Sequence, residues 1–424
     1  MPSKTRTEAE AMLRDPRLVI QIVDDIQQLG VVGDKPLVLT LYLVGTSRLL
    51  DSPLSCIVQG PSSSGKSYPI ETIARMMPPE QIIMAKQMTP QALFHMEPGA
   101  LVHKFIVAGE RSRMENDDQA EATRALRELI SSHKLSKLMP TKNGNKIETV
   151  LIEQDGPIAF IESTTLSQIF EEDANRCILL QTDERPEQTK RILECIGTKY
   201  ANGSDKTSSA TILDRHHALQ RILQPSPVII PFALKIIEKF PSDRVEARRA
   251  ITHMFSMVSV IAFLHQLQRD RDADGQIIAR SEDYAIAVRL LDEPLSRFLG
   301  CRISPAALRF HLRLQASFSC DEFTSKQADE RENVTSRAVS GWLRELANAG
   351  IVEQTQPHRG SAPAKWKLVF GKEPQTRSNI PSFKDIFGDP AQTHSDDNET
   401  PQNKRYSCEP PPISGCVPAT ACGL

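Results

Sequence analysis

Apolar positions recur along the chain with two different periods, and the changes from one period to the other predict its elements. Residues 18–29 and 36–50 carry the spacing of an amphipathic helix. From residue 54 onward, short apolar runs at 54–58, 105–108, 157–161 and 177–181 alternate with longer helical ones. Strands that alternate with helices are typical of a parallel sheet, so we expect an α/β fold in this part of the chain.

The second half of the chain is predicted to be helical to about residue 303. Helical periodicity covers residues 231–240, 244–269 and 281–299. Three further helices at 305–315, 324–331 and 335–348 precede two predicted strands at 351–354 and 364–370. Three helices followed by a two-stranded wing form the winged-helix arrangement, in which the last helix can enter a DNA major groove.

These changes of pattern divide the chain into five segments. We expect an N-terminal helical segment at 1–45, a sheet-containing core at 46–200, a helical lid domain at 201–303, a winged-helix domain at 304–370 and a tail at 371–424. The tail is expected to be disordered because it is rich in Pro, Ser and Asp. A chain of 424 residues is also too long for one compact core, which agrees with several domains.

Composition narrows the class of protein without changing this division. Charged residues make up 25% of the chain and no apolar run is long enough to span a bilayer, so we expect a soluble protein without a membrane partner. The N-terminus does not resemble a signal peptide and the eight cysteines match no zinc-ligand spacing, which favours free thiols in the cytoplasm. With a net charge of −2, any contact with nucleic acid must come from local basic features.

One motif gives the sheet-containing core its predicted chemistry. Residues 60–67 match the phosphate-binding loop pattern G-x-x-x-x-G-K-[ST] between a predicted strand and a predicted helix. The predicted nucleotide-binding residues are Gly60, Pro61, Ser62, Ser63, Ser64, Gly65, Lys66 and Ser67. Small residues let successive backbone N–H groups surround the phosphates of ATP at the helix N-terminus. Lys66 is expected to reach the β- and γ-phosphates, and the Ser67 hydroxyl to bind Mg²⁺.

Polar residues at the ends of the following strands are candidates for hydrolysis. Glu110 follows the strand at 105–108, where a nucleotide hydrolase places an acid that polarises the attacking water. An ordinary surface-loop glutamate is the alternative. Thr164 and Thr165 follow the strand at 157–161, and their hydroxyls could hydrogen-bond the γ-phosphate or the attacking water.

Three arginines are candidates for contact with the nucleotide. Arg176 precedes the strand at 177–181, and it is either structural or presented to the nucleotide of a neighbouring subunit. Arg248 and Arg249 lie near the start of the helix at 244–269, and one of them could contact the nucleotide. Surface ion pairs are an equally weighted alternative for these two residues.

Basic residues at two places are candidates for contact with DNA. The predicted DNA-binding residues are Lys142 and Lys146 at the tip of a hairpin, Arg337 and Arg344 on the exposed face of the last helix of the winged-helix segment, and Arg359 in its wing. The hairpin is predicted because Asn143-Gly144 lies between two extended runs. By charge alone the hairpin is an ordinary solvated one. Basic residues exceed acidic ones only slightly in the winged-helix segment, so docking of another protein is an alternative there.

An ordered series of motifs resembles the ATPase region of mobile-element primase-helicase proteins, which belong with the MCM-like AAA+ helicases and often carry a CHC-type zinc finger. The segments that carry the resemblance are residues 53–60, 62–67, 103–104, 126–131, 155–157, 163–165, 175–177 and 183–189. The resemblance covers about residues 16 to 300. A series of motifs in order is far more specific than the phosphate-binding loop alone.

The resemblance implies a role for each candidate residue. The loop at 60–67 looks like Walker A, Glu110 like the catalytic glutamate of Walker B, and Thr164 or Thr165 like sensor 1. Arg176 looks like the arginine finger, and Arg248 and Arg249 are similar to a sensor 2 region. The hairpin falls where such helicases carry a pre-sensor hairpin that grips DNA in the pore of a hexamer, which favours the DNA role over the solvated one.

Two departures from the family pattern are visible in the sequence. The usual pair of Walker B acids is here Gly109-Glu110, so the carboxylate on the metal side is missing. No zinc finger or primase domain precedes the core, so priming by this chain alone is not expected.

The sequence therefore predicts an AAA+ ATPase core with a helical lid and a C-terminal winged-helix domain. The expected function is that of an ATP- and Mg²⁺-dependent DNA helicase or translocase, hexameric, for replication of a mobile element or phage. One alternative is an ATP-switched DNA-binding regulator or loader that does not unwind DNA. A third possibility is an interaction platform in an anti-phage or mobile-element operon.

Overall fold

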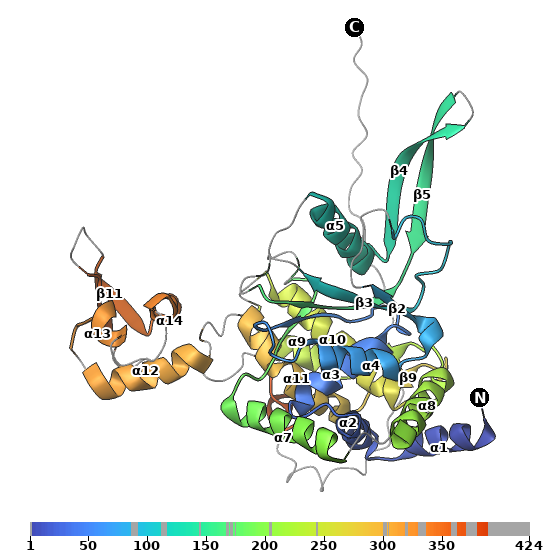
Figure 1. Cartoon of the computed structure of the whole chain (residues 1–424), viewed down its shortest axis with the longest axis horizontal. Helices are drawn as coiled ribbons and strands as arrows, with labels where there is room; N and C mark the ends of the chain where they lie inside the picture. Colours follow the sequence, from blue (N-terminus) through green and yellow to red (C-terminus); the bar gives the residue numbers. More distant parts are fainter. Residues whose placement is uncertain are drawn as a thin grey trace, which may run out of the picture.

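A parallel sheet lies at the centre of the molecule (Figure 1). The computed structural model describes residues 2–85, 92–111, 117–143, 146–166, 169, 173, 175–202, 206–242, 245–299, 303, 305–318, 321–329, 336–357, 363–369 and 380–388. The sheet has five strands, all parallel, in the order β2-β3-β6-β1-β7. Their bounds are β1 Ser55–Gln59, β2 Ile82–Ala85, β3 Lys104–Arg111, β6 Ile158–Thr164 and β7 Ile178–Gln181. The predicted α/β class is confirmed, and β2 is a strand that the sequence pattern did not predict.

The main hydrophobic core lies on one face of this sheet and takes in helices from distant parts of the chain. The helices that contribute buried residues to it are α1 (Ser3–Arg14), α2 (Leu18–Gln28), α3 (Lys35–Ser47), α4 (Ser67–Met76), α8 (Lys206–Ile222), α9 (Ala233–Lys239), α10 (Ala247–Leu264) and α11 (Ser281–Phe298). α3 is buried along almost its whole length and crosses the boundary expected between residues 45 and 46. The N-terminal helices and the expected lid helices therefore share one core with the sheet, because an apolar helix face is stable only when another element covers it.

The other face of the sheet carries α5 (Asp117–Ser132) and a long hairpin. On β1, Cys56 and Val58 belong to the main core, whereas Ile57 belongs to a second cluster with Leu129 of α5. This alternation follows from the two-residue period of a strand. The hairpin strands β4 (Lys134–Asn143) and β5 (Lys146–Asp155) pair antiparallel and project away from the sheet (Figure 1). The predicted hairpin is confirmed, although residues 144 and 145 at its turn lie outside the described residues.

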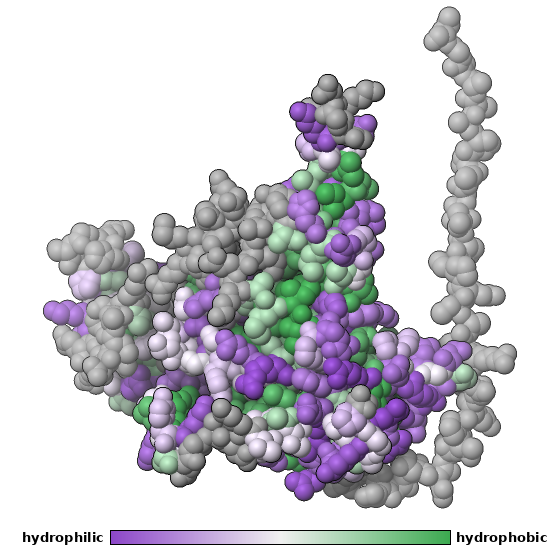
Figure 2. All heavy atoms as spheres, turned by 45° about the vertical axis from the view of Figure 1, so that its right-hand side comes forward, coloured by the Kyte–Doolittle hydropathy of each residue, from purple (hydrophilic) through white to green (hydrophobic). Residues whose placement is uncertain are grey.

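Apolar side chains are exposed along the projecting hairpin (Figure 2). Leu138 and Leu151 are partners across the two strands, and their exposed fractions are 66% and 54%. Near the base of the hairpin, Leu135 is fully buried in the cluster beneath α5. A two-stranded ribbon is only marginally stable in water by itself, so the hairpin depends on this anchored base.

The remaining elements of the core are short or peripheral. They are the 3₁₀ turn η1 (Pro79–Gln81), the helix α7 (Pro186–Asn202), and the paired parallel strands β8 (Val228–Ile229) and β9 (Ile277–Ile278). Among the described residues, Cys56 and Cys195 are free thiols, and burial raises the pKa of Cys56 well above its ordinary value. No helix in the described part of the chain has both the length and the apolar character that crossing a bilayer requires.

A second, smaller unit follows α11 and has its own hydrophobic cluster. It consists of α12 (Pro305–Phe318), α13 (Ser325–Asp329), α14 (Ser336–Asn348), and a three-stranded sheet of β10 (Phe323–Thr324), β12 (Lys365–Leu368) and β11 (Val352–Gln356) in that order. Phe310, Leu343 and Trp366 are buried at its centre. The three predicted helices and two C-terminal strands are therefore present, and β10 is an additional strand.

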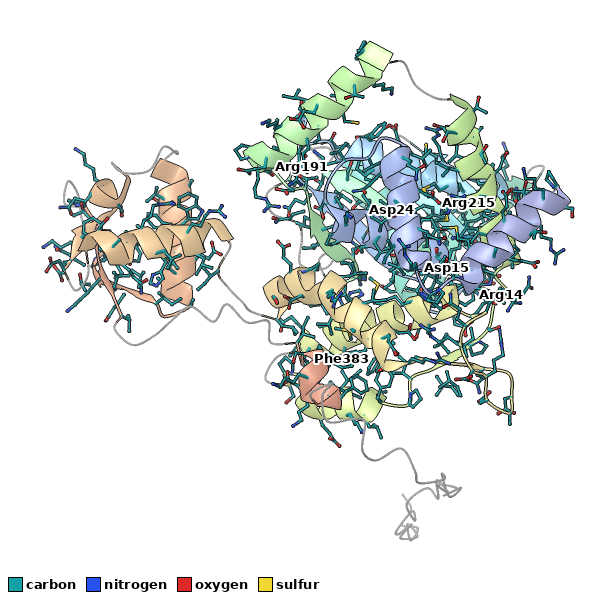
Figure 3. The ribbon with its side chains drawn as sticks, turned by 90° about the horizontal axis from the view of Figure 1, so that it is seen from below. Arg14, Asp15, Asp24, Arg191, Arg215 and Phe383 are labelled. Atoms are coloured by element: carbon teal, nitrogen blue, oxygen red, sulfur yellow. The ribbon has the colours of Figure 1, made fainter. Side chains whose placement is uncertain are left out.

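One part of the expected disordered tail is folded instead. Residues 380–388 contain the helix α15 (Phe383–Phe387), which lies against the main core (Figure 3). The Tyr284 hydroxyl of α11 donates a hydrogen bond of 2.6 Å to the carbonyl oxygen of Pro381. Ile380 and Ile386 are buried in the main core. Composition predicted disorder for 371–424, and the prediction is wrong at 380–388 because apolar residues at helical spacing meet an apolar surface on α9 and α11.

Replacing Phe387 with Ala is expected to loosen α15. The Phe387 ring lies 5.1 Å from the Phe232 ring and 6.0 Å from the Tyr284 ring, measured between centroids. Loss of these contacts should cost about 2 kcal/mol of local stability, so the backbone amides of α15 should exchange about 30-fold faster with deuterium. Amides in α10 should keep the parent rate. Unchanged exchange in α15 would mean that the aromatic contacts do not hold the segment.

Candidate functional site

Two glycines shape the loop between β1 and α4, and each does so for a different reason. Gly65 has a φ of +85°, and a Cβ there would meet no atom within 4 Å, so the left-handed backbone conformation selects glycine. Gly60 stands where a Cβ would lie 2.2 Å from the Thr182 Oγ1 atom, so close approach to the residue after β7 selects glycine. The loop curls tightly at the carboxyl end of β1, at the edge where α/β sheets bind ligands.

Lys66 folds back over this loop at the start of α4. Its Nζ atom donates hydrogen bonds of 2.8 Å to the carbonyl oxygens of both Gly60 and Pro61, and its side chain is buried. No side chain within the described residues caps the first amides of α4. A buried ammonium group beside the positive end of a helix dipole makes this end of α4 attractive to an anion.

Glu110 reaches Lys66 from the end of β3. Its Oε1 atom lies 3.8 Å from the Lys66 Nζ atom, and its side chain is about half exposed. The pairing of β3 with β6 shifts between Val107, which pairs with Ile161, and Glu110, which pairs with Ser163. This shift is a bulge of one extra residue on β3, a feature that redirects side chains near sites. The structure therefore brings together Lys66 and Glu110, which are 44 positions apart in the sequence.

The hydroxyl that faces Glu110 belongs to Ser163 and not to either predicted threonine. Thr164 is fully buried, and its Oγ1 atom accepts a hydrogen bond of 3.1 Å from the Leu166 amide. Thr165 follows the end of β6, and neither threonine lines the cavity that Ser163 shares with Glu110. Thr164 points to the opposite face from Ser163, because successive strand residues point to opposite faces. The assignment of Thr164 or Thr165 as a contact to the γ-phosphate or the attacking water stays a prediction.

A large cavity extends from the loop toward the N-terminal helices. Its volume is about 890 Å³, and its lining includes Ser64 and Gly65 of the loop together with Gly30, Val31 and Val32. α7 closes one side, where the Gln188 side chain donates a 2.6 Å hydrogen bond to the Val32 carbonyl oxygen. Pockets of this size, largely apolar with a few polar groups, are typical for small ligands.

The sequence pattern did not predict that the loop of Gly30, Val31 and Val32 lines this cavity. Gly30 and Gly33 have positive φ angles of 96° and 83°. The Gly-Val-Val-Gly stretch between two predicted helices indicates a loop with a defined backbone conformation. This stretch is the feature of the sequence that could have pointed to the loop. Pairing of this loop with α7 could not be foreseen because the two are more than 150 residues apart in the chain.

The predicted arginines lie elsewhere on the molecule. Arg176 donates a hydrogen bond of 2.6 Å from its Nε atom to the Ser131 hydroxyl of α5. Arg248 and Arg249 are exposed in the first turn of α10, and they line neither the large cavity nor the cavity beside Glu110. Burial lowers the pKa of His253 to about 4, and this histidine lies against the backbone of Asn175 and near the charge of Arg249. The start of α10 and the segment before β7 are therefore neighbours.

The predicted DNA-binding residues are only partly within the described structure. Lys142 and Arg344 are exposed, on β4 and α14 respectively. Arg359 and the side chains of Lys146 and Arg337 lie outside the described residues.

The residues present fit a nucleotide with its metal ion. The loop provides open space beside Gly65 and a cavity that continues from it. Within the described residues, no group of three or more His, Cys, Asp or Glu side chains could hold a metal ion.

Comparison with known proteins adds no relative. No protein-family model matches the chain, and no curated protein matches it. The function has to be argued from the geometry and from the motif series.

Proposed function

We propose that this protein is an ATP-hydrolysing AAA+ ATPase with a phosphate-binding loop at residues 60–67. One observation carries the proposal: the Nζ atom of buried Lys66, at the start of α4, lies 3.8 Å from the Glu110 carboxylate at the end of β3. A cation for phosphate and an acid for water, meeting at the carboxyl edge of a parallel sheet, are two of the groups that nucleotide hydrolases use.

In this proposal, the loop and Lys66 hold the triphosphate. The Lys66 ammonium group exchanges the Gly60 and Pro61 carbonyl oxygens for phosphate oxygens, and the free amides of α4 donate to the same anion. The large cavity takes the nucleoside, with the Gly30–Val32 loop and α7 as its walls. Bound Mg²⁺ supplies charge neutralisation at the phosphates, and the Ser67 hydroxyl is its expected protein ligand.

Glu110 orients the attacking water and accepts its proton. The water oxygen forms a bond to the γ-phosphorus as the bond from that phosphorus to the bridging oxygen breaks, and ADP leaves with the bonding electron pair. The Ser163 hydroxyl, which lines the same cavity, is placed to hydrogen-bond the water or the γ-phosphate. Arg176 of a neighbouring copy is the proposed source of positive charge in the transition state, which requires a ring of subunits.

We further propose that hydrolysis moves DNA, with a hexamer as the working state. The projecting hairpin β4–β5, with exposed Lys142, supports this function because it reaches away from the sheet. The smaller unit at 303–369 supports a winged helix, in which α14 would be the helix that contacts duplex DNA. The decisive experiment measures the ATPase rate with and without single-stranded DNA, together with the mass in solution with nucleotide. A protein that stays monomeric with nucleotide, and whose ATPase rate does not change when DNA is added, would contradict this part of the proposal.

Replacing Lys142 and Lys146 together with Ala should weaken the stimulation of ATPase activity by DNA. Each lysine that contacts a phosphate releases about one counterion, so the slope of log affinity against log salt should fall by about one per lysine. Unstimulated ATPase activity should stay at the parent level, because the hairpin lies apart from the Lys66 site. Equal stimulation in parent and variant would leave the hairpin with a structural role only.

The second candidate is an ATP-switched DNA-binding regulator or loader. The specific observation that favours it is Gly109, which leaves β3 with one acid at the site and suggests slow hydrolysis. A strand-displacement assay separates the two functions: a regulator binds ATP and DNA but does not separate the strands.

A further inference from the structure

The cavity beside Glu110 holds more oxygen-bearing side chains than the phosphate-binding motif accounts for. Its volume is about 250 Å³, and Ser67, Glu71, Glu110 and Ser163 all line it. Apart from these four, its lining residues are Ile70, Met84, Ala85, Val107, Ala108 and Gly109. Among the described residues that line the cavity, the polar side chains are therefore these four, and the others are apolar or glycine.

Three elements bring these oxygens together. Ser67 and Glu71 are four residues apart on α4, so they lie on one face of the helix, one turn apart. Glu110 on β3 and Ser163 on β6 are partners in the sheet register. Glu71 therefore lies one helical turn after Ser67, on the side of α4 that faces Glu110.

Ser67 and Glu71 are exposed at the mouth of this cavity, Glu110 is about half exposed, and Ser163 is buried. Ser163 is 5% exposed, and no hydrogen bond to its hydroxyl is present within the described residues. No cation in the described part of the chain pairs with Glu71, whereas Glu110 lies 3.8 Å from Lys66. Two carboxylates and two hydroxyls around one small cavity are oxygen ligands of the kind that Mg²⁺ prefers.

The wall of the cavity that β3 forms carries no carboxylate besides Glu110 among the described residues. Ala108 and Gly109 line it from β3, and neither has a side-chain oxygen. In the helicases that this chain resembles, an acid at the position of Gly109 stands on the metal side. We propose that Glu71 supplies this carboxylate instead, so that Ser67 and Glu71 from α4 hold the Mg²⁺ of a bound nucleotide, directly or through its waters. The inference rests on the proposed ATP function.

Glu71→Gln tests the assignment by removing the charge and keeping the shape. The affinity for ATP in the presence of Mg²⁺ should fall about 10- to 100-fold, the usual effect of losing an inner- or outer-shell metal partner. The affinity measured in EDTA should stay at the parent value, because only the metal contact changes. Equilibrium titration with ATP measures the affinity, and the paramagnetic resonance signal of Mn²⁺ with ATP present reports metal binding. Neither measurement requires hydrolysis. Glu238→Gln, at an exposed position of α9, is the matched control and should change neither affinity.

A second variant keeps the test decisive. Gly109 does not have a positive φ among the described residues, so a left-handed backbone conformation does not oppose Asp at this position. Gly109→Asp in the Glu71→Gln background should restore Mg²⁺-dependent affinity by returning a carboxylate to the opposite wall. Parent-like Mg²⁺ dependence in Glu71→Gln, or no recovery in the double variant, would overturn the assignment. A parent protein that binds no ATP, with or without Mg²⁺, would overturn the proposed function instead.

Discussion

Lys66→Ala is expected to lower ATP turnover by about 10³-fold, the scale observed when a preorganised charged donor to a transition state is removed. The Lys66 Nζ atom is buried and has three oxygen neighbours, on Gly60, Pro61 and Glu110, so no other described lysine is placed to replace it. With alanine at position 66, the Gly60 and Pro61 carbonyl oxygens lose their hydrogen-bond donor. The phosphates of bound ATP also lose their nearest cation. Release of inorganic phosphate over time is the measurement.

Folding has to be separated from chemistry in this variant. Loss of two buried hydrogen bonds should cost about 1–3 kcal/mol, which a protein of this size tolerates. Circular dichroism and the melting temperature will show whether the variant remains folded. Lys190→Ala on the exposed surface of α7 is the matched control and should turn over ATP like the parent. Parent-like turnover in a folded Lys66→Ala protein would reject the site.

Glu110→Gln is expected to separate binding from hydrolysis. General-base catalysis contributes about 10²- to 10⁴-fold, so the rate of hydrolysis should fall by that amount. Affinity for ATP should be equal or higher, because the variant removes a negative charge that lies 3.8 Å from the phosphate-binding lysine. Single-turnover hydrolysis and equilibrium ATP binding, measured on the same protein, give the two quantities.

The pattern of the two results matters as much as their size. Lys66→Ala should lose both binding and turnover, whereas Glu110→Gln should lose turnover alone. If Glu110→Gln reduces binding as strongly as hydrolysis, the glutamate holds Lys66 or the loop in place and does not act on water. Equal rates of hydrolysis in the parent and in Glu110→Gln would mean that another residue acts as the general base.

The helices of the smaller C-terminal unit follow from local sequence pattern, whereas α15 depends on tertiary contacts. Helices near 305–315 and 335–348 were predictable because apolar residues repeat at helical spacing within each segment. α15 spans only Phe383–Phe387, and so short a helix is unstable in isolation. Its order comes from contact with Phe232 and Tyr284, which lie about 100 or more residues earlier.

The sequence by itself determined the α/β class, the positions of most helices and strands, and the loop at residues 60–67. Each of these is specified by neighbours along the chain: apolar periodicity, or glycines whose conformation the loop needs. It also singled out Lys66 through the phosphate-binding loop pattern, and Glu110 through its position just after the predicted strand at 105–108.

Only the tertiary structure decided which groups meet. The sheet order and the bulge on β3 bring Glu110 to Lys66 and place Ser163, not Thr164, beside it. Folding against α4 adds Glu71 to that cavity, and packing of α7 on the Gly30–Val32 loop closes the larger one. These contacts depend on strand register and on elements distant in sequence, and a shift of one residue reverses the face of a strand, so local pattern could not fix them.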